Sequence, residues 1–222
     1  MSVLVKICGL KTADALDAAL AAGADLVGFV FFSPSPRHLG LDEARTLGAR
    51  VKDRAAKVAL VVDAGDATLD AIVEALRPDM LQLHGKEPPE RVAELKRRLR
   101  LPVMKAIPVE AGTDLAAVPA YAGVADRLLF DARAPRAATR PGGLGKPFDW
   151  HLLQDVDRTV PFMLSGGLDA GNVAEALAVT RAAGVDVSSG VERAPGEKDP
   201  DRIVAFIRAA RNALKTKIAS TA

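Results

Sequence analysis

The alternation of short apolar segments with segments of helical periodicity constrains the fold of this chain more than any other feature. The pattern predicts eight strands, at residues 3–7, 26–31, 58–62, 80–83, 103–107, 128–130, 162–164 and 185–187. Helical periodicity spans residues 14–22 and begins again at about Asp42, Thr68, Pro88, Asn172 and Asp201. Eight alternating units favour an α/β fold closed into a parallel (β/α)8 TIM barrel. An open doubly wound sheet has the same periodicity and stays the alternative.

A repeated aspartate supports the number of strands. A short turn and an aspartate stand at the start of each even-numbered predicted strand, namely Asp25, Asp79, Asp126 and Asp186. Their spacings are 54, 47 and 60 residues, close to two strand-helix units of about 30 residues each. The repeat therefore indicates four pairs of such units.

Length and composition limit the organisation of the chain. With 222 residues, 49% of them hydrophobic, we expect one domain over residues 1–222, with a flexible tail beyond about residue 215. Thirty Lys and Arg residues against 28 Asp and Glu leave a net charge of +2, spread along the chain, which argues against nucleic-acid binding.

The single cysteine and the hydropathy pattern indicate the compartment. Cys8 has no second cysteine with which to form an intramolecular disulfide, so a reducing environment is expected. No signal-like segment opens the chain, and no apolar run approaches the roughly 20 residues that a membrane span needs. We therefore expect a cytoplasmic protein without a membrane partner.

Polar side chains at the ends of several predicted strands point to one functional rim. In TIM barrels the active site lies at the carboxyl ends of the strands, and side chains of one parity point into the mouth. The residues expected there are Lys6, Cys8, Gln82, His84, Asp131, Asp186 and Ser188.

Each of these side chains also has a purely structural interpretation. A lone cysteine such as Cys8 is commonly a small buried apolar residue, although here it directly precedes a glycine at a strand end. Asp131 could cap the next segment, and His84 could be a hydrogen-bonded structural histidine. Asp186 also fits the series of turn aspartates.

Two glycine-containing turns predict a phosphate site. Ser165-Gly166-Gly167 follows the seventh predicted strand and Ser188-Ser189-Gly190 follows the eighth, the two places where TIM barrels commonly bind phosphate. Glycine lets the backbone approach an anion, and a helix beginning near Asn172 would add positive potential. Two ordinary tight turns are the alternative.

The segment 133–147 is rich in Pro, Gly and Arg and is predicted to be a mobile loop over the mouth. Its glycines do not form a nucleotide-binding P-loop, because Arg140 and Pro147 occupy positions where that motif needs glycine and a hydroxyl residue. The three histidines are far apart in the chain and predict no metal site, and the dinucleotide-binding fingerprint is missing after the first strand.

Taken together and in order, seven motifs resemble those of the phosphoribosylanthranilate isomerases. They are VKICGL at 5–10, GFVF at 28–31, SPSPR at 33–37, QLHG at 82–85, LFD at 129–131, LSGGL at 164–168 and VSSGVE at 187–192. The resemblance spans the chain from about Val3 to the last helix. One departure is His38, where the family often has an aromatic residue, and it affects the expected packing of the substrate.

The resemblance implies an isomerase of tryptophan biosynthesis that needs no cofactor and no metal. Its reaction is the Amadori rearrangement of N-(5-phosphoribosyl)anthranilate to 1-(2-carboxyphenylamino)-1-deoxyribulose 5-phosphate. Carried over to this chain, Asp131 is the general acid and Cys8 the general base. Arg37 would bind the anthranilate carboxylate, and the phosphate would lie at Gly166, Gly167, Ser189 and Gly190. Lys6, Gln82, His84 and Asp186 are the further candidates for substrate binding.

These roles require opposite protonation states. Cys8 must form a thiolate near neutral pH, which the nearby Lys6 could favour, whereas Asp131 must retain its proton. Such a pair predicts a bell-shaped dependence of the rate on pH.

Three alternatives remain at the level of the sequence. Other phosphosugar barrels, such as the isomerase of histidine biosynthesis or indole-glycerol-phosphate synthase, typically place a carboxylate or a lysine where this chain has Cys8. The chain could also be a non-catalytic barrel that binds a phosphorylated ligand, or a subunit of a larger enzyme assembly. A monomer and a homodimer are both compatible with the sequence.

Overall fold

The computed structural model contains a closed barrel of eight parallel strands, β1 to β8, in the order of the sequence. It describes residues 3–135, 138, 142 and 147–219, without the side chains of 214–219. The strands are Leu4–Cys8, Leu26–Phe31, Ala56–Val61, Met80–Leu83, Val103–Val109, Arg127–Ala132, Phe162–Leu164 and Gly184–Val187. Pairing of β1 with β8 closes the barrel, so the predicted single-domain (β/α)8 fold is confirmed and the open sheet is excluded.

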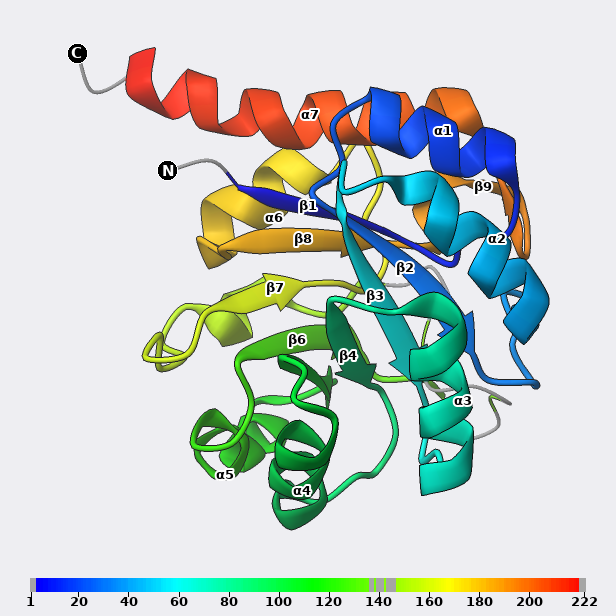
Figure 1. Cartoon of the computed structure of the whole chain (residues 1–222). Coiled ribbons are helices and arrows are strands. Elements are labelled where there is room, and N and C mark those ends of the chain that lie inside the picture. The colour runs from blue at the N-terminus through cyan, green and yellow to red at the C-terminus, as the bar shows by residue number, and fades with distance from the viewer. Residues whose placement is uncertain (1–2, 136–137, 139–141, 143–146, 220–222) are drawn as a thin grey trace.

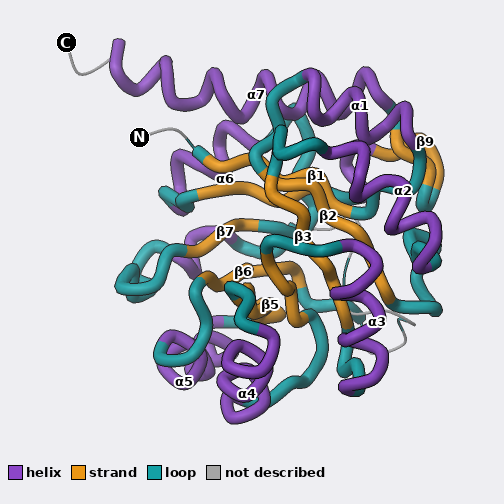
Figure 2. Tube along the Cα trace, in the orientation of Figure 1, coloured by secondary structure: helices purple, strands orange, loops and turns teal. Residues whose placement is uncertain are grey.

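Helices cover the outside of the barrel (Figures 1 and 2). They are α1 Ala13–Ala21, α2 Leu41–Val51, α3 Asp66–Leu76, α4 Pro89–Leu99, α5 Val118–Ala122, α6 Val173–Thr180 and α7 Pro200–Ala219. The amphipathic pattern explains them: each of α1, α2 and α3 buries four residues at helical spacing against the strands.

Three connections differ from a regular strand-helix unit, and the sequence pattern did not predict them. After β5, a 3-10 helix (Gly112–Ala117) runs into the short α5, which has a proline in its first turn. After β6, the described residues form only the 3-10 helix Trp150–Leu153. After β8, a 3-10 turn (Ser189–Val191) leads into a hairpin of β9 (Glu192–Ala194) and β10 (Glu197–Lys198).

The interior of the barrel changes from apolar to polar along the strands. At the amino ends, a layer of buried apolar side chains fills the barrel, including Leu26, Val58, Met104, Leu129 and Met163. Nearer the carboxyl ends the same strand faces carry the buried polar residues Lys6, Gln82, Asp131, Ser165 and Asp186. The site therefore rests on a packed floor.

Three of the four repeated aspartates act as clamps between neighbouring odd-numbered and even-numbered strands. Asp25 accepts a hydrogen bond from the backbone N–H of Val5 at 2.7 Å. Asp79 accepts one from Lys57 at 2.8 Å, and Asp126 one from Val103 at 2.9 Å. Asp186 does not belong to this series, because it lies within β8, where its register partner is Lys6 on β1.

Two predictions concern regions that the structure describes only in part. The predicted mobile loop at 133–147 lies mostly outside the described residues. Helix α7 extends to Ala219, and the predicted flexibility of the tail beyond about residue 215 stays a prediction.

Candidate active site

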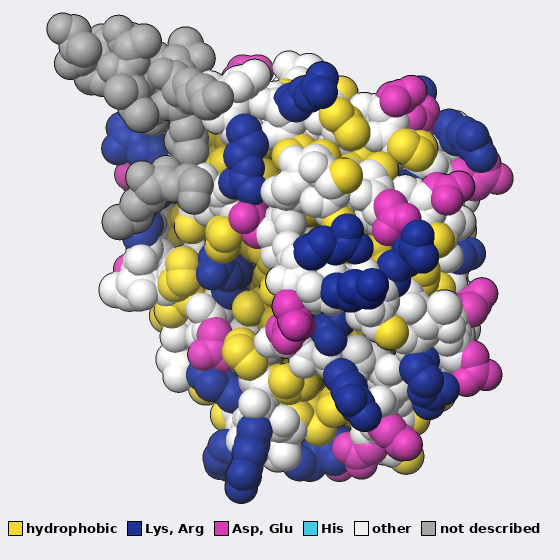
Figure 3. Space-filling model, turned by 45° about the horizontal axis from the view of Figure 1, so that its top comes forward, with side chains coloured by type: hydrophobic (Ala, Val, Ile, Leu, Met, Phe, Trp, Pro, Cys, Tyr) yellow, Lys and Arg dark blue, Asp and Glu magenta, His cyan; other side chains and the backbone are white. Residues whose placement is uncertain are grey.

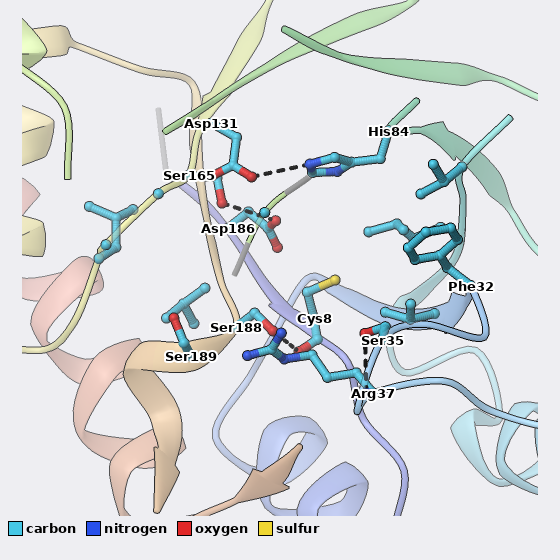
Figure 4. A pocket seen from close by; sticks show the side chains of 18 residues that line it. Cys8, Phe32, Ser35, Arg37, His84, Asp131, Ser165, Asp186, Ser188 and Ser189 are labelled. Atoms are coloured by element: carbon cyan, nitrogen blue, oxygen red, sulfur yellow. Dashed lines mark hydrogen bonds and ion pairs between the residues drawn. The ribbon is translucent and has the colours of Figure 1, made fainter. Parts of the chain in front are cut away.

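A cavity of about 650 Å³, open to solvent, lies at the carboxyl ends of the strands. Of the predicted site residues, those that line it are Cys8, Arg37, His84, Asp131, Gly166, Gly167, Asp186, Ser188 and Ser189. In Figure 4 the Cys8 sulfur points into the space between Asp131 and His84 on one side and Arg37 on the other. This volume includes space open to solvent, and the lining combines apolar side chains with converging polar groups, as in sites for small organic molecules.

Cys8 occupies its position because β2 carries a glycine beside it. Gly28 is the register partner of Cys8. A Cβ atom at residue 28 would lie 2.9 Å from the Cys8 Sγ and 3.1 Å from the Lys6 Nζ, too close for either atom to stay in place. Gly28 lies within one of the recognised motifs, yet the sequence alone did not indicate this role.

A buried ion pair lies beneath Cys8. Lys6 donates a hydrogen bond from Nζ to Asp186 Oδ1 at 2.9 Å, and the Lys6 side chain is fully buried. Burial by itself lowers the pKa of Lys6, but the Asp186 carboxylate and Cys8 outweigh it and raise that pKa above its ordinary value. The lysine therefore stays charged inside the barrel.

The protonation of Cys8 in the free protein differs from the expectation. Burial raises the pKa of the thiol, and the Asp186 carboxylate raises it further, while Lys6 and Lys198 lower it. The net direction is upward, whereas a base near neutral pH would need a lowered pKa. Lys6 acts in the expected sense, but desolvation of the thiolate is the larger effect.

Asp131 is held by a chain of two side chains, Gln82 on β4 and His84 directly after it. His84 Nε2 lies 3.1 Å from Asp131 Oδ2, and Gln82 Nε2 lies 3.0 Å from His84 Nδ1. If the Gln82 amide donates to Nδ1, then Nε2 carries the ring proton and donates it to Oδ2, which leaves Oδ1 for a ligand. Gly142 lies close by, since a Cβ atom there would be 2.4 Å from Asp131 Oδ2.

The turn after β7 presents backbone amides to the cavity. Gly166 and Gly167 have φ angles of 87° and 67°, and a Cβ atom on Gly166 would lie 2.4 Å from the backbone nitrogen of Ala132. Within the described residues, no protein acceptor takes a hydrogen bond from the amides of Gly166 and Gly167. Consecutive amides in such a conformation form a concavity that suits an anion.

The start of α6 contributes less than expected. Asp169 Oδ1 accepts hydrogen bonds from the amides of Gly171 at 2.7 Å and Asn172 at 3.1 Å. These bonds lie in the turn before α6, whose N-cap residue is Asn172, so Asp169 places a negative charge near the amino end of the helix. The turn amides are left as the main anion-binding groups.

Arg37 lies at the opposite side of the cavity and is held by a carboxylate. Its Nε and Nη2 atoms donate to the two carboxylate oxygens of Glu192 at 2.7 and 2.8 Å. Lys198 donates to Glu192 Oε1 at 2.7 Å. Burial lowers the pKa of Lys198 to about 8, despite the opposing effect of Glu192.

Three predicted site residues do not line the cavity. Lys6 and Gln82 are buried beneath it and support Cys8 and His84. Gly190 packs against the turn after β7, since a Cβ atom there would lie 1.9 Å from the carbonyl oxygen of Leu168. The structure places all three behind the groups that face a ligand.

Ser165 belongs to a predicted phosphate-binding turn, whereas Glu192 and Lys198 were not predicted as site residues. Ser165 lines the cavity, and its Oγ lies 3.4 Å from Asp186 Oδ2. Glu192 was noted only as the end of a motif, and Lys198 carries no local signal at all. His38, the departure from the expected pattern, is exposed and lies outside this cavity.

Comparison with known proteins identifies the family. A sequence model described as N-(5'-phosphoribosyl)anthranilate (PRA) isomerase matches residues 5–209. The chain belongs to the PRA isomerase family. The predicted resemblance is thereby confirmed, and the rival phosphosugar barrels are set aside.

Curated relatives of the same name cover nearly the whole chain. The N-(5'-phosphoribosyl)anthranilate isomerase of Bradyrhizobium diazoefficiens is 67% identical over 95% of this chain and 95% of its own length. That of Rhodopseudomonas palustris is 68% identical over 95% of this chain and 97% of its own length.

Solved PRA isomerase structures share the fold. The enzyme from Thermotoga maritima superposes with a TM-score of 0.86 and 34% identity, covering 95% of this chain and 99% of its own. A PRA isomerase in complex with reduced 1-(o-carboxyphenylamino)-1-deoxyribulose 5-phosphate has a TM-score of 0.83 and 32% identity over 95% and 99% of the two chains.

The described residues contain neither a metal-binding cluster nor a membrane-spanning helix. No group of three or more His, Cys, Asp or Glu side chains in this part of the chain could hold a metal ion. No helix in the same residues is both long and apolar enough to cross a membrane.

Proposed function

We propose that Cys8 and Asp131 are the general base and the general acid of an Amadori rearrangement in this chain. As a member of the PRA isomerase family, the chain is an isomerase of tryptophan biosynthesis. The substrate would be N-(5-phosphoribosyl)anthranilate and the product 1-(2-carboxyphenylamino)-1-deoxyribulose 5-phosphate. The observation that carries the proposal is that Cys8 and Asp131 face one cavity, with anion-binding groups at both of its ends.

The two charged ends of the substrate match these groups. The phosphate would accept hydrogen bonds from the amides of Gly166, Gly167 and Ser189, and the anthranilate carboxylate would pair with Arg37. Binding at both ends would place the sugar ring between Asp131 and Cys8. A complex with a reduced product analogue is known for a relative of the same fold.

Ring opening is the step assigned to Asp131. Its carboxyl group donates a proton to the furanose ring oxygen, the bond from C1 to that oxygen breaks, and the nitrogen lone pair forms a protonated imine at C1. His84, at 3.1 Å from Oδ2, orients the carboxyl group and stabilises the carboxylate that is left.

Proton removal from C2 is the step assigned to Cys8. The thiolate takes the C2 proton, the C1–C2 double bond forms, and the imine nitrogen receives the electron pair, which gives an enolamine that tautomerises to the ketone. Cys8 ends with one proton more and Asp131 with one fewer, and exchange with water restores both. Because the cationic imine acidifies C2, this sequence of steps requires no metal and no organic cofactor.

Because the pKa of Cys8 is raised in the free protein, the substrate itself would help to form the thiolate. In the empty site the effect of burial outweighs that of Lys6 and Lys198, and the protonated imine would add a further positive charge beside the thiol. The thiolate is then favoured when the intermediate that needs the base is present. This arrangement limits the reactivity of the thiolate in the empty site.

The proposal extends to location and partners. We infer a cytoplasmic enzyme, monomeric or homodimeric, that acts on a small phosphosugar and binds neither nucleic acid nor a membrane. On the face shown in Figure 3, positive and negative side chains are interspersed, which is unlike the continuous basic stripe of a nucleic-acid interface.

The decay of anthranilate-type fluorescence after addition of protein to freshly made N-(5-phosphoribosyl)anthranilate tests the function. We expect rapid turnover by the wild type and a loss of at least about a hundredfold in kcat for Cys8→Ala and Asp131→Asn. Turnover by Cys8→Ala at the wild-type rate would remove Cys8 as the base. Absence of wild-type turnover in folded protein would contradict the reaction and favour a barrel that only binds a phosphorylated ligand.

A further inference from the structure

A buried cluster of three charged side chains lies behind the cavity. The Arg37 guanidinium binds both Glu192 oxygens at 2.7 and 2.8 Å, and Lys198 Nζ binds Glu192 Oε1 at 2.7 Å. The side chains of Glu192 and Lys198 are only 4% and 2% exposed. Neither residue lines the cavity, so any effect they have on a ligand passes through their neighbours.

The same lysine is tied to the turn after β8. Lys198 Nζ donates to the Ser188 carbonyl oxygen at 2.8 Å and lies 3.1 Å from the Ser188 Oγ. With the bond to Glu192, these contacts use all three donors of the ammonium group. Ser188 Oγ in turn donates to the carbonyl oxygen of Cys8 at 3.1 Å.

We propose that Glu192 and Lys198 are positioning residues that hold Arg37 at a fixed distance from the phosphate-binding turn at Ser188 and Ser189. This inference rests on the proposed function, in which Arg37 takes the carboxylate end of the substrate and the turn takes part of its phosphate end. Glu192 fixes the guanidinium, Lys198 fixes the turn, and the bond between them joins the two ends.

The energetics favour a role in orientation over a role in stability. A buried ion pair is costly to desolvate, and a well-packed apolar replacement often stabilises a protein equally well. Here three long side chains are ordered in one arrangement that connects β9 and β10 with Arg37, 155 positions from Glu192 in the chain. Rigid placement of both ends lowers the entropy that a substrate with two anionic groups loses on binding.

Glu192→Gln distinguishes positioning from simple charge. The cluster of Arg37, Glu192 and Lys198 carries a net charge of +1, and this variant removes its one negative charge, which by charge alone would not weaken the binding of an anionic substrate. Positioning predicts weaker binding. We expect KM to rise about tenfold, the effect of losing one charge-assisted hydrogen bond. We expect kcat to stay within about threefold, because neither end of the substrate changes charge during the reaction.

A double variant distinguishes the positioning of Arg37 from the net charge of the cluster in an independent way. Glu192→Gln combined with Lys198→Met has the wild-type net charge of +1, carried by Arg37, but lacks the bridge between Arg37 and the turn. If positioning is the role, KM stays raised by about tenfold in the double variant. Return of KM to the wild-type value would overturn the proposal in favour of a charge effect.

Ligands of different length provide a readout that general damage to the fold would not reproduce. Reduced 1-(o-carboxyphenylamino)-1-deoxyribulose 5-phosphate has both anionic ends, whereas inorganic phosphate engages only the turn. We expect Glu192→Gln to raise the dissociation constant of the two-ended ligand about tenfold. The inhibition constant of phosphate should stay within about twofold of the wild-type value. Equal weakening of both ligands would overturn the proposal.

The same hairpin supplies a matched control. Glu197 pairs with Arg193 at 3.1 Å, and both side chains are more than half exposed, so Glu197→Gln should leave KM and kcat unchanged. If Glu192→Gln does not fold, Lys198→Met is measured in its place. A raised KM in that variant supports the proposal, and an unchanged KM overturns it. Wild-type turnover with an unchanged KM in Glu192→Gln overturns this inference alone, whereas absence of wild-type turnover overturns the proposed function.

Discussion

At the scale of single residues, the reactivity of Cys8 depends on burial and on the charged groups around it. Burial raises its pKa, Lys6 lowers it, and Asp186 raises it. Lys6 and Asp186 are register partners on β1 and β8, and their ion pair lies under the sulfur. Small changes in this pair should therefore move the protonation of the base.

We expect Lys6→Met to raise the pKa of Cys8, so that the rate of Cys8 alkylation increases only at a higher pH than in the wild type. The substitution removes the cation that lowers the pKa of Cys8 and leaves Asp186 without its partner, and both changes disfavour the thiolate. The variant should also lose about 3–5 kcal/mol of stability, because an uncompensated buried carboxylate remains.

Alkylation by iodoacetamide as a function of pH provides the measurement, because Cys8 is the only cysteine in the chain. Cys8→Ser, which should not react, is the control. A midpoint that stays at the wild-type pH in folded Lys6→Met would contradict the assigned role of Lys6.

At the scale of elements, clamps at the starts of the strands and glycines at their ends shape the barrel. Asp25, Asp79 and Asp126 join the start of an even-numbered strand to the backbone of the preceding odd-numbered one. At the opposite ends, Gly28 and Gly166 provide space that any side chain would fill. Stability and function are thereby separated between the two rims of the barrel.

We expect Asp126→Asn to reduce the free energy of unfolding at pH 7 by about 1 kcal/mol and to leave kcat/KM unchanged. Burial by itself raises the pKa of Asp126, but hydrogen bonds from Lys96 and the Val103 amide outweigh it and lower that pKa. Because the pKa of Asp126 is lower in the folded state, its ionised carboxylate stabilises the fold at any pH above the pKa of the unfolded state, about 3.9. This stabilisation is lost as the pH falls through the lower pKa of the folded state.

Urea unfolding at pH 7 and near pH 3 tests this expectation. The difference between wild type and Asp126→Asn should be largest at pH 7 and should shrink in acid. A difference that grows in acid, or a large loss of activity at pH 7, would show that Asp126 does not act as a clamp.

At the scale of the whole molecule, closure joins the two ends of the chain. β8 pairs with β1, and α7 packs on α1 and α6 (Figure 1). Arg211 of α7 donates hydrogen bonds to the carbonyl oxygens of Val3 and Gly23 and to the Asp25 carboxylate. We propose accordingly that residues 1–222 form one domain that unfolds as a unit.

We expect Arg211→Ala to lower the free energy of unfolding by about 1–3 kcal/mol, because the carbonyl group of the buried Val3 and the half-buried Asp25 carboxylate lose this partner at the barrel closure. Urea denaturation followed by circular dichroism and by tryptophan fluorescence should give one transition at the same midpoint for both signals. Arg208→Ala, at an exposed position of the same helix, should be neutral. Separate midpoints for the two signals in the wild type would contradict the single domain.

The sequence by itself determined the units of the fold and the groups that carry the chemistry. Strand and helix periods are local properties of the backbone, so eight strands, six of the helices and the shared face of Lys6 and Cys8 could be predicted from nearby residues. The glycine turns after β7 and β8 were recognisable for the same reason. The order of the motifs identified the family before any contact was known.

Only the tertiary structure decided which distant groups meet and how they affect one another. Asp186 and Asp126 look alike in the sequence, yet one binds Lys6 inside the barrel and the other clamps a strand. The contact of Arg37 with Glu192 joins residues 155 positions apart. The upward shift of the Cys8 pKa depends on burial by the assembled barrel. Desolvation and long-range pairing arise only when the chain closes, and no local pattern encodes them.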